Sequence, residues 1–355
     1  MRNLIIKYLL FISFIFGVLL SNKSVYKPLS LNTSFSIGYD SNPLRLSSNE
    51  INDLLDRPYL LGGASSIHSR FIQYNIGFKF FSKKGLLSRI FKNKKTIFDF
   101  KFSDKTHFNN KSKSSYNILF KIDQQLGNYR HFYIDYFLMP SFYLREYEDL
   151  DYVFDTEDMY YEAYRSCYFD IEKISFSYQA PLKNRDSKIK VGLSYERQLF
   201  DKYFTEFDLN IMGLFGQISF LNDGKGRLML YYSYEDADNF RYLDGSFSTL
   251  NMDRSYIQKR LKLSLSRSSD SNKSYGAIMD SYYRYNSSDI YSDELHYKRS
   301  HNDITLSLWY KFDKHKITFS NRRRTTTSPR DWVNNLKTFK RYTLTYTVSL
   351  GKVRL

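Results

Sequence analysis

The chain has 355 residues, a formal net charge of +16, 33 Tyr, 30 Phe and one cysteine. The lone Cys167 excludes an intrachain disulfide and the usual Cys-rich zinc sites, so we expect a small buried or lipid-facing residue there. A mean hydropathy of −0.51 excludes a membrane protein built from several apolar helices. Strands that alternate apolar and polar residues average to such a value.

The N-terminal segment, from Met1 to about Ser24, has the pattern of a secretory signal peptide. Arg2 and Lys7 are positive, and residues 8–20 form an apolar stretch that is too short for a stable membrane-spanning helix. We therefore expect an exported bacterial chain with a signal peptide at 1–24 and one domain at 25–355. Few residues separate this segment from the first predicted strand, so any plug is expected to come from an infolded loop.

Apolar and aromatic residues then recur at every second position along almost the whole chain, which predicts β-strands. The predicted strands are 31–39, 72–80, 98–102, 116–122, 132–138, 160–178, 189–195, 208–220, 228–234, 257–265, 275–285, 303–312, 316–324 and 338–350. In the sixth strand the apolar positions change parity between Ile171 and Ile174, which predicts a β-bulge. A second change of parity lies in the eighth strand, near Met212 to Leu214.

The last predicted strand, 338–350, shows the pattern most clearly, with Tyr342, Leu344 and Tyr346 on one face and Thr343 and Thr345 on the other. No helical segment is available to cover such faces, so closure of the sheet with its apolar side in lipid is expected. The predicted fold is all-β: a transmembrane, antiparallel, up-and-down β-barrel of about 14 strands in the cell outer membrane of a Gram-negative bacterium. The last strand is expected to pair with the first.

The lengths of the connections support this registration. Those after even strands are mostly short and those after odd strands are mostly long, as expected for periplasmic turns and extracellular loops. The alternative is a secreted β-sandwich or propeller, which would need two buried layers and more Gly and Pro in its turns.

The polar faces of the strands carry charges of both signs. We expect the lumen to be lined by Lys79, Asp99, Lys101, Lys121, Asp123, Asp135, Lys188, Lys190, Glu196, Arg260, Lys262, Asp280, Arg284, Arg299, Asp303 and Arg341. The functional hypothesis is a passive channel or uptake pore for small polar or anionic solutes. The alternative is that these charges only fill the barrel.

Two loops carry charge of a single sign. The basic connection at 81–95 has apolar residues at helical spacing, which fits a short interfacial helix on anionic lipid or a solvated turn. The acidic loop at 146–158 could bind Ca²⁺ or bridge to lipopolysaccharide, but it lacks an EF-hand pattern and also fits a solvated loop. We expect no cofactor and no metal site.

His301 and Asp303 share one face of a strand, as two members of a hydrolase triad would. No G-x-S-x-G motif accompanies them, so we expect no enzyme. Four arginines flank the last long loop and either contact phosphates of lipopolysaccharide or form a plain basic loop. They are Arg322, Arg323, Arg324 and Arg330.

The segment Gly38-Tyr39-Asp40-Ser41-Asn42-Pro43 places an Asp-x-Asn sequence at the end of the first strand. This resembles the start of the barrel in surface lipoprotein assembly modifiers, which implies a protein-export or surface-assembly barrel. Those proteins usually carry helical repeats before the barrel, and this chain has none. The same residues also fit a turn, because Asp and Asn bond their own backbone and Pro fixes the exit.

The Tyr-rich loops leave a third hypothesis, a structural or adhesive surface protein. Expected partners are outer-membrane lipid, lipopolysaccharide, the barrel assembly machinery and a possible surface or periplasmic protein. Lys and Arg are scattered and no nucleic-acid module is present, so no nucleic acid is expected. Many such barrels end on an aromatic residue; here Leu350 or Leu355 would take its place, or a different closing signal is used.

Overall fold

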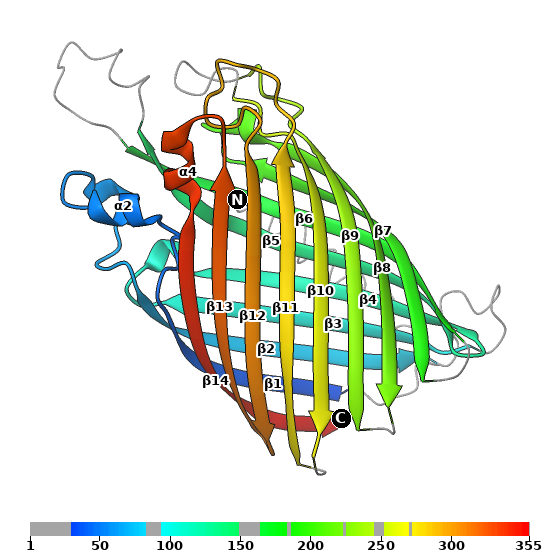
Figure 1. Ribbon diagram of the computed structural model, residues 1–355. Helices are drawn as coiled ribbons and strands as arrows, with labels where there is room; N and C mark the ends of the chain where they lie inside the picture. The colour runs from blue at the N-terminus through cyan, green and yellow to red at the C-terminus, as the bar shows by residue number, and fades with distance from the viewer. Residues whose placement is uncertain are drawn as a thin grey trace.

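The computed structural model describes residues 30–82, 94–148, 164–182, 186–222, 225–244, 252–269 and 272–354, and the strands in these ranges form one closed sheet (Figure 1). Strands that follow one another in the chain are hydrogen-bonded neighbours, all pairs are antiparallel, and β14 pairs with β1. The predicted barrel, its number of strands and its closure are thus confirmed.

The strands are β1 (Ser30–Asp40), β2 (Ser69–Ser82), β3 (Thr96–His107), β4 (Ser115–Gly127), β5 (Arg130–Glu148), β6 (Tyr164–Pro181), β7 (Ser187–Phe200), β8 (Leu209–Asn222), β9 (Gly226–Asp238), β10 (Tyr256–Ser268), β11 (Lys273–Asn286), β12 (Ser300–Phe312), β13 (His315–Thr327) and β14 (Phe339–Arg354). Short helical segments lie in the connections: α2 (Ser48–Asn52), η1 (Pro58–Leu61), η2 (Lys111–Lys113), η3 (Thr205–Phe207) and α4 (Asp331–Lys337). Within the described ranges, no helix has the length and apolar character needed to cross a membrane.

The seam between β1 and β14 joins the two apolar patterns in register. Ile37 lies opposite Tyr346 and Tyr39 lies opposite Leu344, so their side chains share the outer face. One irregularity, between Thr33 and Ser34, interrupts the pairing. The pairing of β1 with β14 therefore closes the sheet, and neither strand is left with an unpaired edge.

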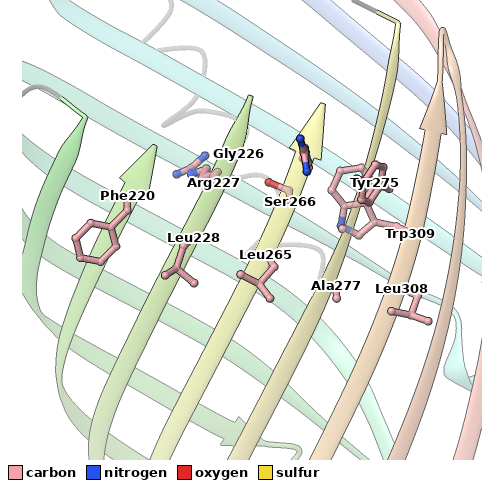
Figure 2. Close-up of a pocket in the computed structure, with 12 residues that line it drawn as sticks. Phe220, Gly226, Arg227, Leu228, Leu265, Ser266, Tyr275, Ala277, Leu308 and Trp309 are labelled. Atoms are coloured by element: carbon pink, nitrogen blue, oxygen red, sulfur yellow. The ribbon is translucent and has the colours of Figure 1, made fainter. Parts of the chain in front are cut away.

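An apolar belt covers the outside of the barrel. Figure 2 shows part of it, a row formed by Phe220, Leu228, Leu265, Ala277 and Leu308 on β8 to β12, which are partners across four successive strand pairs. Leu308 is 61% exposed, and large exposed apolar side chains recur on β1, on β2 and on each strand from β6 to β14. A soluble monomer rarely exposes a contiguous apolar surface of this kind, whereas lipid covers it.

The β-bulge predicted in β6 is absent, and the second change of parity, in β8, is not a bulge either. The register of β6 with β7 and of β8 with its neighbours runs without a shift, and the extra residues near this region lie on β5, between Met139 and Phe142 and again after Tyr143. The apolar residues change face because Phe169 on β6 and Ile211 on β8 point inward into buried clusters at one end of the barrel. Near β6 and β8 the inner face at that end is therefore apolar where these clusters pack.

The loops with the described helices lie at the end of the barrel opposite the C-terminus, where α2 and α4 are neighbours (Figure 1). The tight turn predicted at Gly127-Asn128 is present, with Asn128 and Tyr129 both at positive φ, as a two-residue hairpin requires. The signal peptide at 1–24, most of the basic connection at 81–95 and most of the acidic loop at 146–158 lie outside the described residues.

Candidate functional site

The inner face of the barrel carries the charged side chains that alternate with the apolar belt. Arg299 lies just before β12. The other predicted residues lie within strands, at the positions between the outward apolar ones: Lys79, Asp99, Lys101, Lys121, Asp123, Asp135, Lys188, Lys190, Glu196, Arg260, Lys262, Asp280, Arg284, Asp303 and Arg341.

Many of these side chains meet across neighbouring strands. Asp99 Oδ2 lies 3.4 Å from Lys79 Nζ and 3.9 Å from Lys101 Nζ. Lys121 Nζ lies 3.4 Å from Asp135 Oδ1. Cross-strand pairs of opposite charge stabilise the sheet modestly, so these contacts help to hold the wall as well as to line it.

In most of these pairs the cation is more exposed than its carboxylate. The side chain of Lys101 is 57% exposed and that of Asp99 is 16% exposed, while the values for Arg260 and Asp280 are 38% and 21%. Lys190 with Asp135 is the exception, at 17% and 22%. The inner surface therefore presents cations to solvent and keeps carboxylates behind them.

The most buried of these carboxylates is Asp303, on β12. Its oxygens accept hydrogen bonds from Arg322 Nε and Nη2 at 2.8 Å each, from Arg324 Nε at 3.0 Å and from the Tyr282 hydroxyl at 2.8 Å. Charge-assisted and bidentate contacts of this kind are the strongest hydrogen bonds in proteins. Two arginines of β13 thus share one carboxylate.

A second buried carboxylate, Asp40, lies at the seam. Arg341 of β14 donates to it through Nε at 2.8 Å and also through Nη2. Arg341 is also the direct partner of Arg322 in the pairing of β13 with β14, so two like charges lie opposite each other on the inner face. Such a pair is unfavourable unless negative charge lies close by.

The connection from β1 to β2, residues 41–68, is called loop 1 and folds over this region. Asn42 Oδ1 accepts from Leu46 N at 2.9 Å and Asn42 Nδ2 donates to Leu46 O at 2.8 Å, which closes a turn that contains Arg45. Asn42 Nδ2 also lies 3.3 Å from Lys340 O, so the turn is tied to β14. The turn expected from Asp40-x-Asn42 is present, and it positions Arg45 at positive φ.

Further along loop 1, α2 begins with a capping box. Ser47 Oγ accepts from Glu50 N at 3.1 Å, and Glu50 Oε2 accepts from Ser47 N at 2.9 Å. Glu50 is buried and also bonds Arg145 of β5. Burial disfavours its charge, but Arg145 and then Lys337 outweigh that effect and hold the pKa of Glu50 below its usual value.

The rest of loop 1 packs through apolar side chains. Leu44, Leu46 and Tyr143 form a buried cluster, with leucines of 54–61 around it. Lys113 Nζ, in η2, donates to Tyr143 O at 2.7 Å. Loop 1 is therefore a folded cover at the mouth with its own small core.

We name Arg45, Arg322, Arg324 and Arg341 the arginine cluster.

Replacing Gly62 is expected to detach loop 1 from the wall. Gly62 has φ +57, and a Cβ there would lie 2.0 Å from the Tyr143 hydroxyl. Gly63 is the matched control, because its φ is +72 and nothing lies within 4 Å of a Cβ. Both Ala variants cost about 1–2 kcal/mol because the backbone is left-handed at these positions. Only the Cβ of Gly62→Ala would also clash with Tyr143. We expect faster proteolysis of loop 1 in Gly62→Ala than in Gly63→Ala, and equal rates would contradict this packing.

The sequence prediction placed four arginines on either side of the last long loop, and the structure gives them different surroundings. Arg322 and Arg324 lie within β13 on its inner face, so for these two the prediction of a loop or lipopolysaccharide contact is wrong. Arg323 lies between them and points outward, exposed. Arg330 lies in the loop, with Nη2 3.5 Å from Glu294.

Several charged residues of the inner face were missed. Lys173 on β6 pairs with Glu196 at 3.0 Å and with Glu235 at 3.6 Å. It was missed because the predicted bulge left its face undefined. Arg45 lies in a loop, where no period marks which side chains point inward. The only feature of the sequence that pointed to Arg45 was the neighbouring turn at Asn42-Pro43.

His301 and Asp303 do not form a catalytic pair in this arrangement. His301 Nδ1 lies 2.9 Å from Thr326 Oγ1, and Asp303 is engaged by Arg322, Arg324 and Tyr282. Within the described ranges, no group of three or more His, Cys, Asp or Glu side chains could hold a metal ion. Cys167 is fully buried in an aromatic cluster, as the interpretation of a small buried residue requires.

Comparison with known proteins finds similar folds among solved structures. No family model and no curated protein matches the sequence. Among solved structures, OccAB4 of Acinetobacter baumannii is 8% identical with a TM-score of 0.41, over 94% of this chain and 100% of that chain. The outer-membrane channel DcaP of the same species is 7% identical with a TM-score of 0.47, over 91% and 97%. OprD of Pseudomonas aeruginosa is 7% identical with a TM-score of 0.38, over 94% and 97%. By its own closed sheet and apolar belt, the chain is a β-barrel of the bacterial outer membrane.

Proposed function

We propose that the barrel is a passive channel that admits small polar solutes and favours anions. The observation that carries the proposal is the unequal exposure within the inner ion pairs, in which cations face the solvent and carboxylates lie behind them. A solute in the interior would meet Lys101 and Arg260 before it met Asp99 or Asp280.

The expected electrostatic effect is moderate for each charge and adds along the barrel. A unit charge about 8 Å from an ion contributes about 0.5 kcal/mol in water, and more where low-dielectric walls focus the field. Basic residues outnumber acidic ones on the inner face, in keeping with the net charge of +16. Several such contributions favour anions over cations of the same size.

Loop 1 adds a constriction at one end. It packs against β5 through Tyr143 and Arg145, and the turn that carries Arg45 is tied to β14 by the contact of Asn42 with Lys340 O. A loop that folds inward narrows a barrel without a separate plug domain. Solutes that cross would pass close to the arginine cluster.

Recording from single barrels in planar phospholipid bilayers tests the channel. We expect stable current steps from the refolded protein, and no steps from protein that has been heat-denatured before addition. An export barrel or an adhesive protein with a filled lumen would give no stable current steps. The absence of such steps would therefore contradict the proposal. No catalytic step is part of this function.

The same proposal assigns partners to the outside of the barrel. Arg323 and Lys340 are direct partners across β13 and β14, and both are exposed on the outer face near the loop end. Phosphates of lipopolysaccharide would complement them. The barrel assembly machinery would engage β14, the closing strand, during insertion.

A further inference from the structure

The arginine cluster contains one guanidinium with no counter-ion. Arg45 Nε is buried and has no hydrogen-bond partner, and the described part of the chain offers Arg45 no ion pair. An unpaired buried donor on a charged group costs more than a neutral one. Buried polar groups without a partner are rare in native proteins, and a bound water or ion that supplies the acceptor is one explanation for them.

The carboxylates nearby are already engaged and hidden. Asp303 is shared by Arg322 and Arg324, and Asp40 is held by Arg341. The side chains of Asp303 and Asp40 are 1% and 0% exposed. Those of Arg322, Arg324 and Arg341 are 19%, 18% and 17% exposed. The accessible side of the cluster is thus made of guanidinium groups.

The electrostatic environment of Arg45 agrees with this arrangement. Burial and then the charges of Arg322, Arg341 and Arg324 lower the pKa of Arg45 to about 9, so the group stays protonated at pH 7 under strong repulsion. In η2, burial followed by the charge of Arg45 lowers the pKa of Lys113 well below its usual value. An anion at this point would relieve both groups.

We propose that the arginine cluster is a binding site for the oxyanion group of a small solute, a phosphate or a carboxylate. The forked N–H donors of a guanidinium group match two oxygens of a planar carboxylate or a tetrahedral phosphate. A chloride ion has no second oxygen to match the fork and fits it less well. Asn42 acts as a positioning residue, because its side chain closes the turn that carries Arg45. The inference rests on the proposed anion channel and names the place where the solute binds during passage.

Calorimetric titration of the refolded barrel in detergent tests the site. Inorganic phosphate and, separately, malonate are titrated at constant ionic strength set with chloride. We expect saturable heat from at least one of them, and the stronger of the two identifies the preferred oxyanion. Arg45→Gln is expected to weaken that binding about tenfold, the usual effect of losing one charge-assisted contact.

Arg57→Gln is the matched control, because it removes the same charge from an exposed position of the same loop. It is expected to leave binding unchanged, and Arg45→Lys, which keeps the charge without the fork, is expected to give an intermediate affinity. No saturable heat from the unmodified barrel, or equal losses in Arg45→Gln and Arg57→Gln, would overturn the site. A barrel that conducts without saturable binding refutes the site alone, whereas one that binds phosphate but carries no current refutes the channel alone.

Discussion

Asp303→Ala is expected to destabilise the folded barrel by about 3–5 kcal/mol, the cost of breaking a buried ion pair from one side. The Asp303 carboxylate accepts hydrogen bonds from Arg322, Arg324 and Tyr282. Its removal leaves both guanidinium groups without their counter-charge, and Arg341 lies directly opposite Arg322. Urea titration in lipid vesicles, followed by the heat-modifiable shift on gels, measures the loss.

Asp280→Ala is the control for that measurement. Asp280 forms the same type of pair, with Arg260 Nε at 2.8 Å, one strand away on β11. Its arginine is 38% exposed, so solvent screens the unpaired charge and we expect a loss of about 1 kcal/mol or less. Similar losses in the two variants would show that Asp303 does not anchor the wall.

The double variant Lys79→Glu/Lys101→Glu is expected to shift the ratio of chloride to potassium permeability by about tenfold toward potassium. Both lysines flank Asp99 and are more exposed than it is. Reversing them replaces two cations by two carboxylates beside an existing carboxylate. The zero-current potential in a salt gradient across a planar bilayer reports the change.

Lys259→Glu/Lys340→Glu carries the same reversal of charge on the outer face, where both residues are exposed. It keeps the net charge equal to that of the inner double variant. We expect its zero-current potential to stay close to that of the unmodified barrel. A shift of the same size from both double variants would mean that net charge, and not the inner face, sets the ion preference.

Period two in the sequence was sufficient to predict the barrel, because each strand has one face in lipid and the pattern repeats along the chain. The pairing of 31–39 with 338–350 followed from closure. The strands extend beyond the predicted ranges where polar residues continue the pairing; β13 reaches Thr327, for example. The alternation of apolar residues cannot locate these strand ends, because polar residues in a strand cannot be told from polar residues in a loop by sequence pattern.

The site was less accessible to the sequence. Lys79, Asp99, Arg260 and Asp280 follow from alternation alone, but which cation meets which carboxylate depends on register across strands. Beside β6 the inner face at the loop end is apolar because η3 packs against it, and this reversed the parity around Phe169. The position of Arg45 depends on how loop 1 folds, and no periodicity encodes that.

The interior presents cations to water, and we expect it to pass anions in preference to cations. The most direct test is the zero-current potential of the unmodified barrel in a planar bilayer with a tenfold gradient of potassium chloride. We expect a stable current whose zero-current potential has the sign of chloride preference. A potential of the opposite sign, or a barrel that never conducts, would contradict it.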